Sequence, residues 1–325
     1  MKLQRILILR MSGDDVRWMQ TRLKEYGFLK DRIDGNFGQN TLVAVTNFQR
    51  AIGIKADGVV GPQTWSNITN YSITKEIKEE VKVEIKDIPF KISYIGEDSL
   101  TIYDNLLSDD EYYKSETRKD MIWLHHTAGG SRPDWTIGGW EKDFQIDKNG
   151  KHTPLKVGTH FVIGRKSSST SDTLWDGKIL RAIDDRYWAY HLGINHKNSK
   201  DLNSKSVSIE ICNYGPLTLG KDGSFYNYVN RPINGSDVVE LDKSFRGYKY
   251  WEKYTDAQIE STYKLIKYLQ TRWSIEIEKQ VYNEDWFEYD NKWFEMGGIR
   301  SHSQVRKDKF DLFPQKEIIQ MLNSI

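Results

Sequence analysis

The chain has 325 residues, of which 38% are hydrophobic and 13% are aromatic. This composition supplies enough apolar side chains for a packed core and excludes a chain that is disordered throughout. Basic and acidic residues nearly balance at a net charge of +1, which excludes a strongly basic nucleic-acid binder, so we expect no nucleic-acid partner.

The cysteine count and the hydropathy pattern bear on the compartment in which the chain is made. Cys212 is the single cysteine, so no intrachain disulfide forms, as is typical of proteins made in a reducing compartment. The apolar run at residues 6–9 is too short for a signal peptide, and no stretch approaches the ~20 apolar residues of a membrane span. We therefore expect synthesis in the cytoplasm without a signal peptide, no stable membrane insertion and a monomer.

Residues 1–68 contain an internal repeat. The segment 34–41, DGNFGQNT, is echoed 23 residues later by the segment 57–64, DGVVGPQT, and each Asp-Gly pair is a turn signal. Apolar residues at helical spacing precede the first segment, from Val16 to Tyr26, and follow it, from Leu42 to Ile52. The pattern predicts a small three-helix domain with two glycine-containing loops. The repeat alone is also consistent with a structural duplication that binds nothing.

This segment resembles the type 1 peptidoglycan-binding domain. The matching residues are Asp15 to Gln20, Leu23, Gly27, the two repeated loops, Phe48-Gln49 and Trp65. The resemblance implies that bacterial peptidoglycan is the partner. Residues 1–68 also carry 10 Lys/Arg against 6 Asp/Glu, a net charge of +4 that favours an anionic partner.

Residues 69–90 differ from both flanking regions. Charged and apolar side chains alternate from Lys75 to Lys86, which is typical of a connector between domains. Residues 91–325 are then the second domain, and the polar, tyrosine-rich residues 91–120 lead into it.

The second domain mixes strand and helix signals, which predicts an α/β fold with a mixed central sheet flanked by helices. A helix is expected to begin at Thr255, which can form a capping box with Gln258, and another is expected at the C-terminus. The turn-rich segments 167–173 and 216–247 are expected to be loops or insertions. The expected strands and the terminal helix cover Met121–His125, His160–Gly164, Ile179–Ile183, Val207–Cys212 and Gln315–Leu322.

A set of metal-ligating residue types is spread along this domain. His125 and His126 end an apolar strand, and His302 lies far downstream with Asp308 and Asp311 after it. Two imidazoles and one carboxylate suit a catalytic zinc ion and leave a fourth position for water. Strand periodicity does not choose between His125 and His126, and residue chemistry does not choose between the two aspartates.

A carboxylate on another strand is a candidate general base. Residues 206–212 alternate strictly, so Ser208 and Glu210 face one side of the strand while Val207, Ile209 and Ile211 face the other. Glu210 is then either an exposed residue of a half-wetted sheet or a proton acceptor beside a metal-activated water.

Residues 121–325 resemble the zinc-dependent N-acetylmuramoyl-L-alanine amidases, the family that includes the peptidoglycan-recognition proteins. The matching motifs occur in the family's order, and they are Ile122 to Gly129, Thr159 to Ile163, Trp188 to Gly193, Ser206 to Ile211, Ser301 to Ser303 and Lys309 to Asp311. A departure from the family pattern is Leu312-Phe313-Pro314, which stands where relatives carry Pro-Gly.

The resemblance resolves the ambiguities of the residue pattern. It implies that His125, His302 and Asp311 are the zinc ligands. It also implies that Glu210 is the catalytic glutamate and that Lys309 assists the reaction.

Further residues are expected near the substrate. His191 matches a histidine of the substrate cleft, although a buried structural role fits it equally well. Thr159 stands where some phage members place a catalytic tyrosine, so that role does not transfer, and Thr159 and Asn213 are expected as substrate contacts only. His126 and His160 are expected to pack or hydrogen-bond beneath the sheet.

The function that follows from both resemblances is hydrolysis of the amide bond between N-acetylmuramic acid and L-alanine. The layout, together with the missing signal peptide, resembles a phage endolysin that acts on the bacterial wall. Two alternatives stay open at this point, namely a peptidoglycan-recognition protein without catalysis and a zinc peptidase that cuts within the stem peptide.

Overall fold

The computed structural model divides into two compact units, one of residues 1–87 with 97–99 and one of residues 88–96 with 100–325. The described residues are 3, 5–29, 31–52, 54–70, 88–96, 100–146, 148–170, 172–277, 280–295 and 297–325. Most of the expected connector, residues 71–87, lies outside them.

The described residues of the first unit form three helices, as predicted. They are α1 (Asp14–Glu25), α2 (Gln39–Ala51) and α3 (Pro62–Asn70). The apolar residues that recur at helical spacing, such as Val16, Met19, Val45 and Phe48, form one buried cluster with residues of the connecting loops. The helical periodicity in the sequence therefore corresponds to the face that each helix buries.

The first repeated loop is held by one buried glutamine. The Gln20 amide nitrogen donates hydrogen bonds to Asp34 Oδ1, to the Asn36 carbonyl and to Thr41 Oγ1, each at 2.9 Å. Its amide oxygen accepts the backbone N–H of Gly35 at 2.7 Å. Gly35 has a φ of 76°, a backbone conformation that favours glycine.

The second loop repeats this arrangement around Gln49. Its amide nitrogen donates to Asp57 Oδ1 at 3.1 Å, to the Val59 carbonyl at 2.9 Å and to Thr64 Oγ1 at 3.1 Å. Its amide oxygen accepts the N–H of Gly58 at 2.8 Å, and Gly58 has a φ of 70°. The repeated Asp, Gly and Thr residues thus shape the loops from inside the protein.

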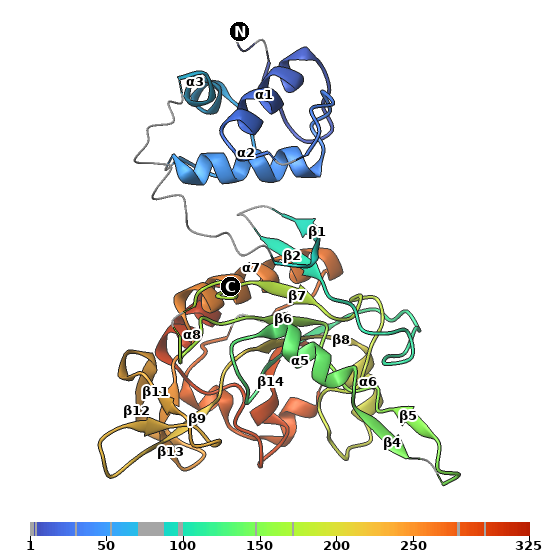
Figure 1. Cartoon of the computed structure of the whole chain (residues 1–325). Helices are drawn as coiled ribbons and strands as arrows, with labels where there is room; N and C mark the ends of the chain where they lie inside the picture. The colour runs from blue at the N-terminus through green and yellow to red at the C-terminus, as the bar shows by residue number, and fades with distance from the viewer. Residues whose placement is uncertain are drawn as a thin grey trace. The chain divides into compact units, whose positions relative to one another are not determined.

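The second unit contains a mixed seven-stranded sheet in the order β1-β2-β7-β6-β8-β3-β14 (Figure 1). Strands β6, β8, β3 and β14 run parallel to one another, while β7 is antiparallel to β6 and β1 is antiparallel to β2. The strands are β1 (Lys91–Ile95), β2 (Thr101–Asp104), β3 (Met121–His126), β6 (Phe161–Ile163), β7 (Ile179–Arg181), β8 (Ser206–Ile211) and β14 (Gly298–Ser301). The predicted mixed central sheet is confirmed.

Helices pack on this sheet and bury it. Phe161 and Ile163 of β6 share a core with Leu265 and Ile266 of α7 (Asp256–Trp273), and α8 (Lys316–Asn323) joins the same core. Val162, which alternates with them, packs with residues of α5 (Pro133–Trp140) in a second core (Figure 1). The predicted capping box of Thr255 and Gln258 begins α7. None of the helices in the described parts of the chain is long and apolar enough to cross a membrane.

The remaining elements are short. A two-stranded hairpin consists of β4 (Phe144–Ile146) and β5 (His152–Pro154), and α6 covers Ser199–Ser204. The described residues after α6 also form 3-10 helices at Gly235–Asp237 (η2), Glu284–Phe287 (η3), Asn291–Phe294 (η4) and His302–Gln304 (η5).

The turn-rich segment 216–247, expected to consist of loops or insertions, forms strands rather than loops. They contribute to a five-stranded antiparallel sheet in the order β11-β10-β9-β13-β12. Its strands are β9 (Pro216–Leu219), β10 (Phe225–Tyr226), β11 (Pro232–Ile233), β12 (Val238–Phe245) and β13 (Tyr248–Glu252). The strands are short and separated by tight turns, so turn residues dominate the sequence signal.

Residues 91–120 are likewise more structured than a lead-in segment. They supply β1 and β2, and β2 pairs in parallel with β7 at the edge of the main sheet.

Candidate active site

The candidate site lies where three neighbouring parallel strands end. In the register between β3 and β8, His125 is opposite Glu210, so both side chains lie on the same face of the sheet. Strand β14 pairs its last residue, Ser301, with Leu124, and His302 follows directly after the strand. The carboxyl ends of parallel strands therefore bring His125, Glu210 and His302 together, although they are far apart in the sequence.

His125, His302 and Asp311 form a compact, buried donor set. His125 Nδ1 lies 3.1 Å from His302 Nδ1 and 3.4 Å from Asp311 Oδ2, and His302 Nδ1 lies 2.9 Å from the same oxygen. The three residues are only 2%, 5% and 6% exposed. Around a tetrahedral zinc ion with bonds of about 2.0–2.1 Å, ligand atoms lie roughly 3.3–3.4 Å apart, which is close to these separations.

The hydrogen bonds on the other side of each imidazole show which nitrogen is available to a cation. His302 Nε2 lies 2.8 Å from the carbonyl of Leu192, which only accepts, so Nε2 carries the proton and Nδ1 presents a lone pair in the neutral ring. That lone pair faces the Asp311 carboxylate oxygen. Two lone pairs at this distance repel unless a cation or a proton lies between them, so the donor set fits a metal ion.

A similar chain of hydrogen bonds orients His125. The Ser206 hydroxyl donates to the Asn203 carbonyl at 3.1 Å and accepts from His191 Nε2 at 2.9 Å. His191 Nδ1 is then the acceptor for His125 Nε2–H at 3.0 Å. The Nδ1 lone pair of His125 is thereby directed at His302 and Asp311.

Burial changes the protonation of these groups. Desolvation lowers the pKa of His125 to about 4, although the hydrogen bond with Asp311 acts in the opposite direction. Burial alone would raise the pKa of Asp311, but the nearby His302 and hydrogen bonds with both histidines hold it well below its usual range. Burial thus favours the neutral form of His125, while Asp311 stays ionised, and metal binding requires both of these states.

Glu210 is buried beside the donor set, so it is not the exposed residue of a half-wetted sheet. Burial raises the pKa of Glu210 well above its usual value, and the charge of Asp311 raises it further. The charge of Lys309 acts in the opposite direction on Glu210, and it also contributes to lowering the pKa of His125. The half-buried Lys309 side chain thus supplies positive charge close to both groups.

The other expected site residues differ in what they contact. Thr159 is 2% exposed and donates to the Phe161 carbonyl at 3.2 Å. Asn213 is fully buried, and its amide donates to the Glu252 carbonyl and accepts from the Gly215 N–H. Both side chains are therefore engaged inside the protein, and their role as substrate contacts stays a prediction.

The two remaining histidines of this region lie away from the donor set. His126 Nδ1 lies 2.7 Å from the Tyr254 hydroxyl, and His160 Nδ1 lies 3.0 Å from the Ser208 backbone nitrogen. Burial lowers the pKa of His126 to about 4 and that of His160 to about 3.

Sequence reasoning missed the contribution of Ser206 and Asn203. Strand alternation places Ser206 on the same face as Glu210, but nothing in the sequence pairs it with His191. The segment 191–192 emerges as the support of both imidazoles, because His191 contacts His125 and the Leu192 carbonyl contacts His302.

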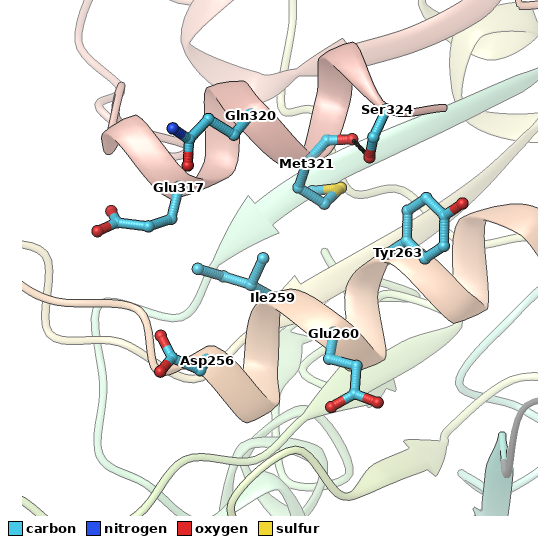
Figure 2. A pocket seen from close by; sticks show the side chains of 8 residues that line it. All are labelled: Asp256, Ile259, Glu260, Tyr263, Glu317, Gln320, Met321 and Ser324. Atoms are coloured by element: carbon cyan, nitrogen blue, oxygen red, sulfur yellow. Dashed lines mark hydrogen bonds between the residues drawn. The ribbon is translucent and has the colours of Figure 1, made fainter.

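A cavity of about 420 Å³ in this unit lies elsewhere, between α7 and α8. Figure 2 shows Ile259, Tyr263 and Met321 at its centre, with the carboxylates of Asp256, Glu260 and Glu317 around it. None of its lining residues belongs to the donor set, so it does not enter the site's chemistry.

Comparison with known families matches both parts of the chain. A sequence model described as a putative peptidoglycan binding domain matches residues 12–68. A second one, described as N-acetylmuramoyl-L-alanine amidase, matches residues 115–311 and thereby about three-fifths of the chain.

Individual relatives share only short segments with this chain. The N-acetylmuramoyl-L-alanine amidase CwlM of Mycobacterium tuberculosis is 46% identical over 54 residues, which are 17% of this chain and 13% of that protein. A probable N-acetylmuramoyl-L-alanine amidase of Bacillus licheniformis is 48% identical over 61 residues, or 18% of this chain and 17% of that protein. The chain thus spans less than a fifth of either relative's length.

Among solved structures, the N-acetylmuramoyl-L-alanine amidase LysC from Clostridium intestinale has a TM-score of 0.33 at 16% identity, covering 68% of this chain and 97% of that one. The amidase family model matches residues 115–311, which are more than half of the chain. On that ground, the chain belongs to the N-acetylmuramoyl-L-alanine amidase family.

Proposed function

We propose that this chain is a zinc-dependent peptidoglycan hydrolase that cleaves the amide bond between N-acetylmuramic acid and the L-alanine of the stem peptide. Family membership supports the choice of bond. The observation that carries the proposal is the convergence of two imidazole lone pairs and one carboxylate within 4.8 Å of one another in a buried cluster.

His125, His302 and Asp311 would hold the zinc ion through Nδ1, Nδ1 and a carboxylate oxygen. When bound, zinc supplies Lewis-acid chemistry that acidifies water and polarises a carbonyl oxygen. Three protein ligands leave one tetrahedral position for solvent or substrate, the arrangement of catalytic rather than structural zinc sites.

Glu210 is the proposed proton carrier. Its register position opposite His125 supports a place beside the attacking water. A carboxylate there accepts the proton of that water and later delivers it to the departing L-alanine amine. The raised pKa of Glu210 suits both steps, since an effective acid–base group titrates near the working pH.

Lys309 is proposed to stabilise the negative charge that develops on the carbonyl oxygen during attack. Its charge already acts on Glu210 and His125, which supports proximity to the reacting groups. A cation placed at developing charge in a water-poor site is worth more than the same cation in bulk water.

His191 is proposed as a positioning residue. Its hydrogen bonds to His125 and Ser206 fix which nitrogen of His125 carries the proton and how the ring is turned. Such partners of metal ligands raise metal affinity without contacting the metal.

The first unit is proposed to hold the enzyme on the peptidoglycan that the second unit cleaves. When the first unit is bound to the wall, the second unit meets its substrate within the same complex. In proteins with short flexible linkers, the effective concentration of the second binding partner is on the order of millimolar. The substrate and the partner are then the same polymer.

A variant of one ligand tests the proposal. The His302→Ala protein should lose bound zinc and wall-clearing activity while it still sediments with insoluble peptidoglycan. His152→Ala, which removes an exposed imidazole of β5, is the matched control and should keep both zinc and activity.

The outcomes separate the alternatives. Full activity of His302→Ala would contradict the metal assignment. A wild-type protein that binds zinc and wall but releases no free amino groups would be a recognition protein. Release of fragments cut inside the stem peptide would identify a peptidase.

A further inference from the structure

The two repeated loops of the first unit differ at positions whose side chains do not bond to Gln20 or Gln49. The repeated Asp and Thr residues and the first glycine of each loop are hydrogen-bonded to Gln20 or Gln49. Between them, the first loop carries Asn36 and Gln39 where the second carries Val59 and Pro62. The first loop therefore presents polar side chains at positions where its copy presents apolar ones.

A cavity of about 420 Å³ lies at the first loop. It is open to solvent and lined by residues 36–39 and residues 9–12. The two segments are fixed to each other by the hydrogen bonds Arg10 N–H to Phe37 carbonyl at 2.9 Å and Phe37 N–H to Met11 carbonyl at 2.7 Å. The cavity is thus framed by backbone pairing rather than by loose side chains.

Arg10 occupies an unusual backbone position at this cavity. The Met11 N–H donates to the Ile8 carbonyl at 3.2 Å, which closes a four-residue turn with Arg10 as its third residue. Arg10 has a φ of 76°, the value that a type II turn requires at this place and that glycine adopts without strain. The chain therefore carries a bulky cation where backbone geometry alone favours glycine.

The charge environment of Arg10 differs from that of Arg5 and Arg32. Among the residues that the structure describes, no carboxylate forms an ion pair with it, whereas Arg5 pairs with Asp15 at 2.9 Å and Arg32 with Asp34 at 3.8 Å. Arg10, Ser12 and Gln39 are exposed residues, and all three line the cavity.

We propose that this cavity binds an oxyanion of the cell wall, with the Arg10 guanidinium as the cation and Ser12 and Gln39 as hydrogen-bonding groups. The net charge of +4 on residues 1–68 favours such a ligand. Peptidoglycan offers it as stem-peptide carboxylates, and wall-attached polymers offer it as phosphates. The proposal rests on the proposed function, because it names the chemistry by which the first unit holds the wall.

The Arg10→Gly variant of the full chain separates binding from folding. Glycine relieves the backbone strain, so the melting temperature should stay the same or rise. Binding to insoluble peptidoglycan, measured by sedimentation, should weaken at least ~10-fold, the effect of losing a hydrogen bond to a charged group. Arg32→Ala is the control, since it removes the same charge from a side chain that is 84% exposed and should bind within about twofold of wild type.

The repeat supplies a second matched pair. Gln39→Ala at the first loop should weaken wall binding, while Pro62→Ala at the equivalent position of the second loop should not. Unchanged binding of Arg10→Gly, or an equal loss in Arg32→Ala, would overturn the proposal.

Two further arms identify the source of the anion. If phosphate is the ligand, wild type and Arg10→Gly should bind equally to a wall from which the phosphate polymers have been removed. If carboxylate is the ligand, soluble stem peptides with free carboxyl groups should compete for binding, whereas stem peptides with amidated carboxyl groups should not. Cleavage of a soluble muropeptide should be unchanged in Arg10→Gly. A wild-type chain that binds wall but cleaves nothing would therefore refute the amidase proposal and leave this site standing.

Discussion

Two adjacent histidines at the end of β3 acquire opposite surroundings from strand geometry alone. His125 points to the face that holds Glu210, His302 and Asp311, whereas His126 points to the other face and contacts Tyr254. Alternation along a strand dictates that the two differ but not which of them meets the other ligands. That choice depends on the pairing of β3 with β8 and β14, which is a long-range property of the fold.

The hydrogen bond between His191 and His125 leads us to expect that zinc affinity depends on His191. His191→Leu removes the acceptor of His125 Nε2–H, so the ring loses its fixed tautomer and orientation. Zinc affinity, measured by competition with a chelator, should fall about 10–100-fold. An affinity equal to that of wild type would show that His191 has only a packing role.

The proposed proton carrier predicts a loss of turnover without a loss of metal. Glu210→Gln keeps the shape of the side chain but neither accepts nor returns a proton. We expect kcat for muropeptide cleavage to fall about 10²–10⁴-fold, with zinc content and wall binding unchanged. Near-normal turnover by this variant would remove Glu210 from the mechanism.

The lowered pKa of the buried His160 leads us to expect that the free energy of unfolding depends on pH. Burial lowers its pKa to about 3 and the charge of Lys119 adds to the shift, while a hydrogen bond with the Tyr187 carbonyl and the charges of Asp185 and Asp184 oppose it. The unfolded chain binds a proton here below a pH of about 6.5 but the folded protein does not, so stability falls as the pH drops from about 6.5 towards 3.

The slope of that dependence is measurable. It should approach about 1.4 kcal/mol per pH unit from this residue, and it should be shallower in His160→Gln when unfolding is followed in denaturant between pH 4.5 and 6.5. His152→Gln, which removes an exposed imidazole, should leave the slope as it is. An unaltered slope in His160→Gln would contradict the assignment.

At the scale of elements, the strand that carries Glu210 leads directly into the five-stranded sheet. Asn213 lies between β8 and β9, and it bonds to Thr127 after β3 and to Glu252 of β13. The inserted sheet is thereby fixed to the two strands that supply His125 and Glu210. Its presence was not predictable from the sequence, because strands of two to eight residues joined by Gly, Asn and Asp give no periodic signal.

A buried network of ion pairs is expected to stabilise the five-stranded sheet. Arg165 lies 3.3 Å from Glu252 and 3.6 Å from Asp237, and Lys166 lies 2.5 Å from the same aspartate. Arg165→Ala leaves Glu252 buried without its cation, so the free energy of unfolding should fall by about 3–5 kcal/mol.

The control for this network is the half-buried surface pair of Arg181 and Asp104. Arg181→Ala should cost less than Arg165→Ala in the same thermal or denaturant experiment, because solvent reaches both side chains of this pair, which are 24% and 21% exposed, and screens it. Equal costs for the two variants would mean that the inserted sheet is not anchored by Arg165.

At the scale of the whole molecule, the sequence predicts most of the architecture and less of the site. The three helices of the first unit, the strands β3, β6, β7 and β8, and the capped helix α7 follow from periodicity, turn residues and a capping box. The donor set follows from resemblance to a family, since spacing alone left Asp308 and Asp311 equivalent. In the structure Asp308 pairs with Arg306, whereas Asp311 faces the histidines.

The remaining features depend on contacts between distant segments. Neither the support of His125 by His191 and Ser206 nor the anchoring of β13 through Arg165 leaves a local pattern, because each pairs residues of different elements. The zinc ion, the catalytic roles and the endolysin function stay predictions.

The central claim is that one zinc ion, held by His125, His302 and Asp311, enables cleavage of the lactyl–L-alanine amide. Mass analysis of purified peptidoglycan digested with and without a chelator tests it most directly. The account predicts stem peptides with free L-alanine amino ends and glycan chains that keep their lactyl groups, with no release in chelator and recovery on adding zinc. Fragments cut within the stem peptide, new reducing sugar ends, or cleavage that persists in chelator would contradict it.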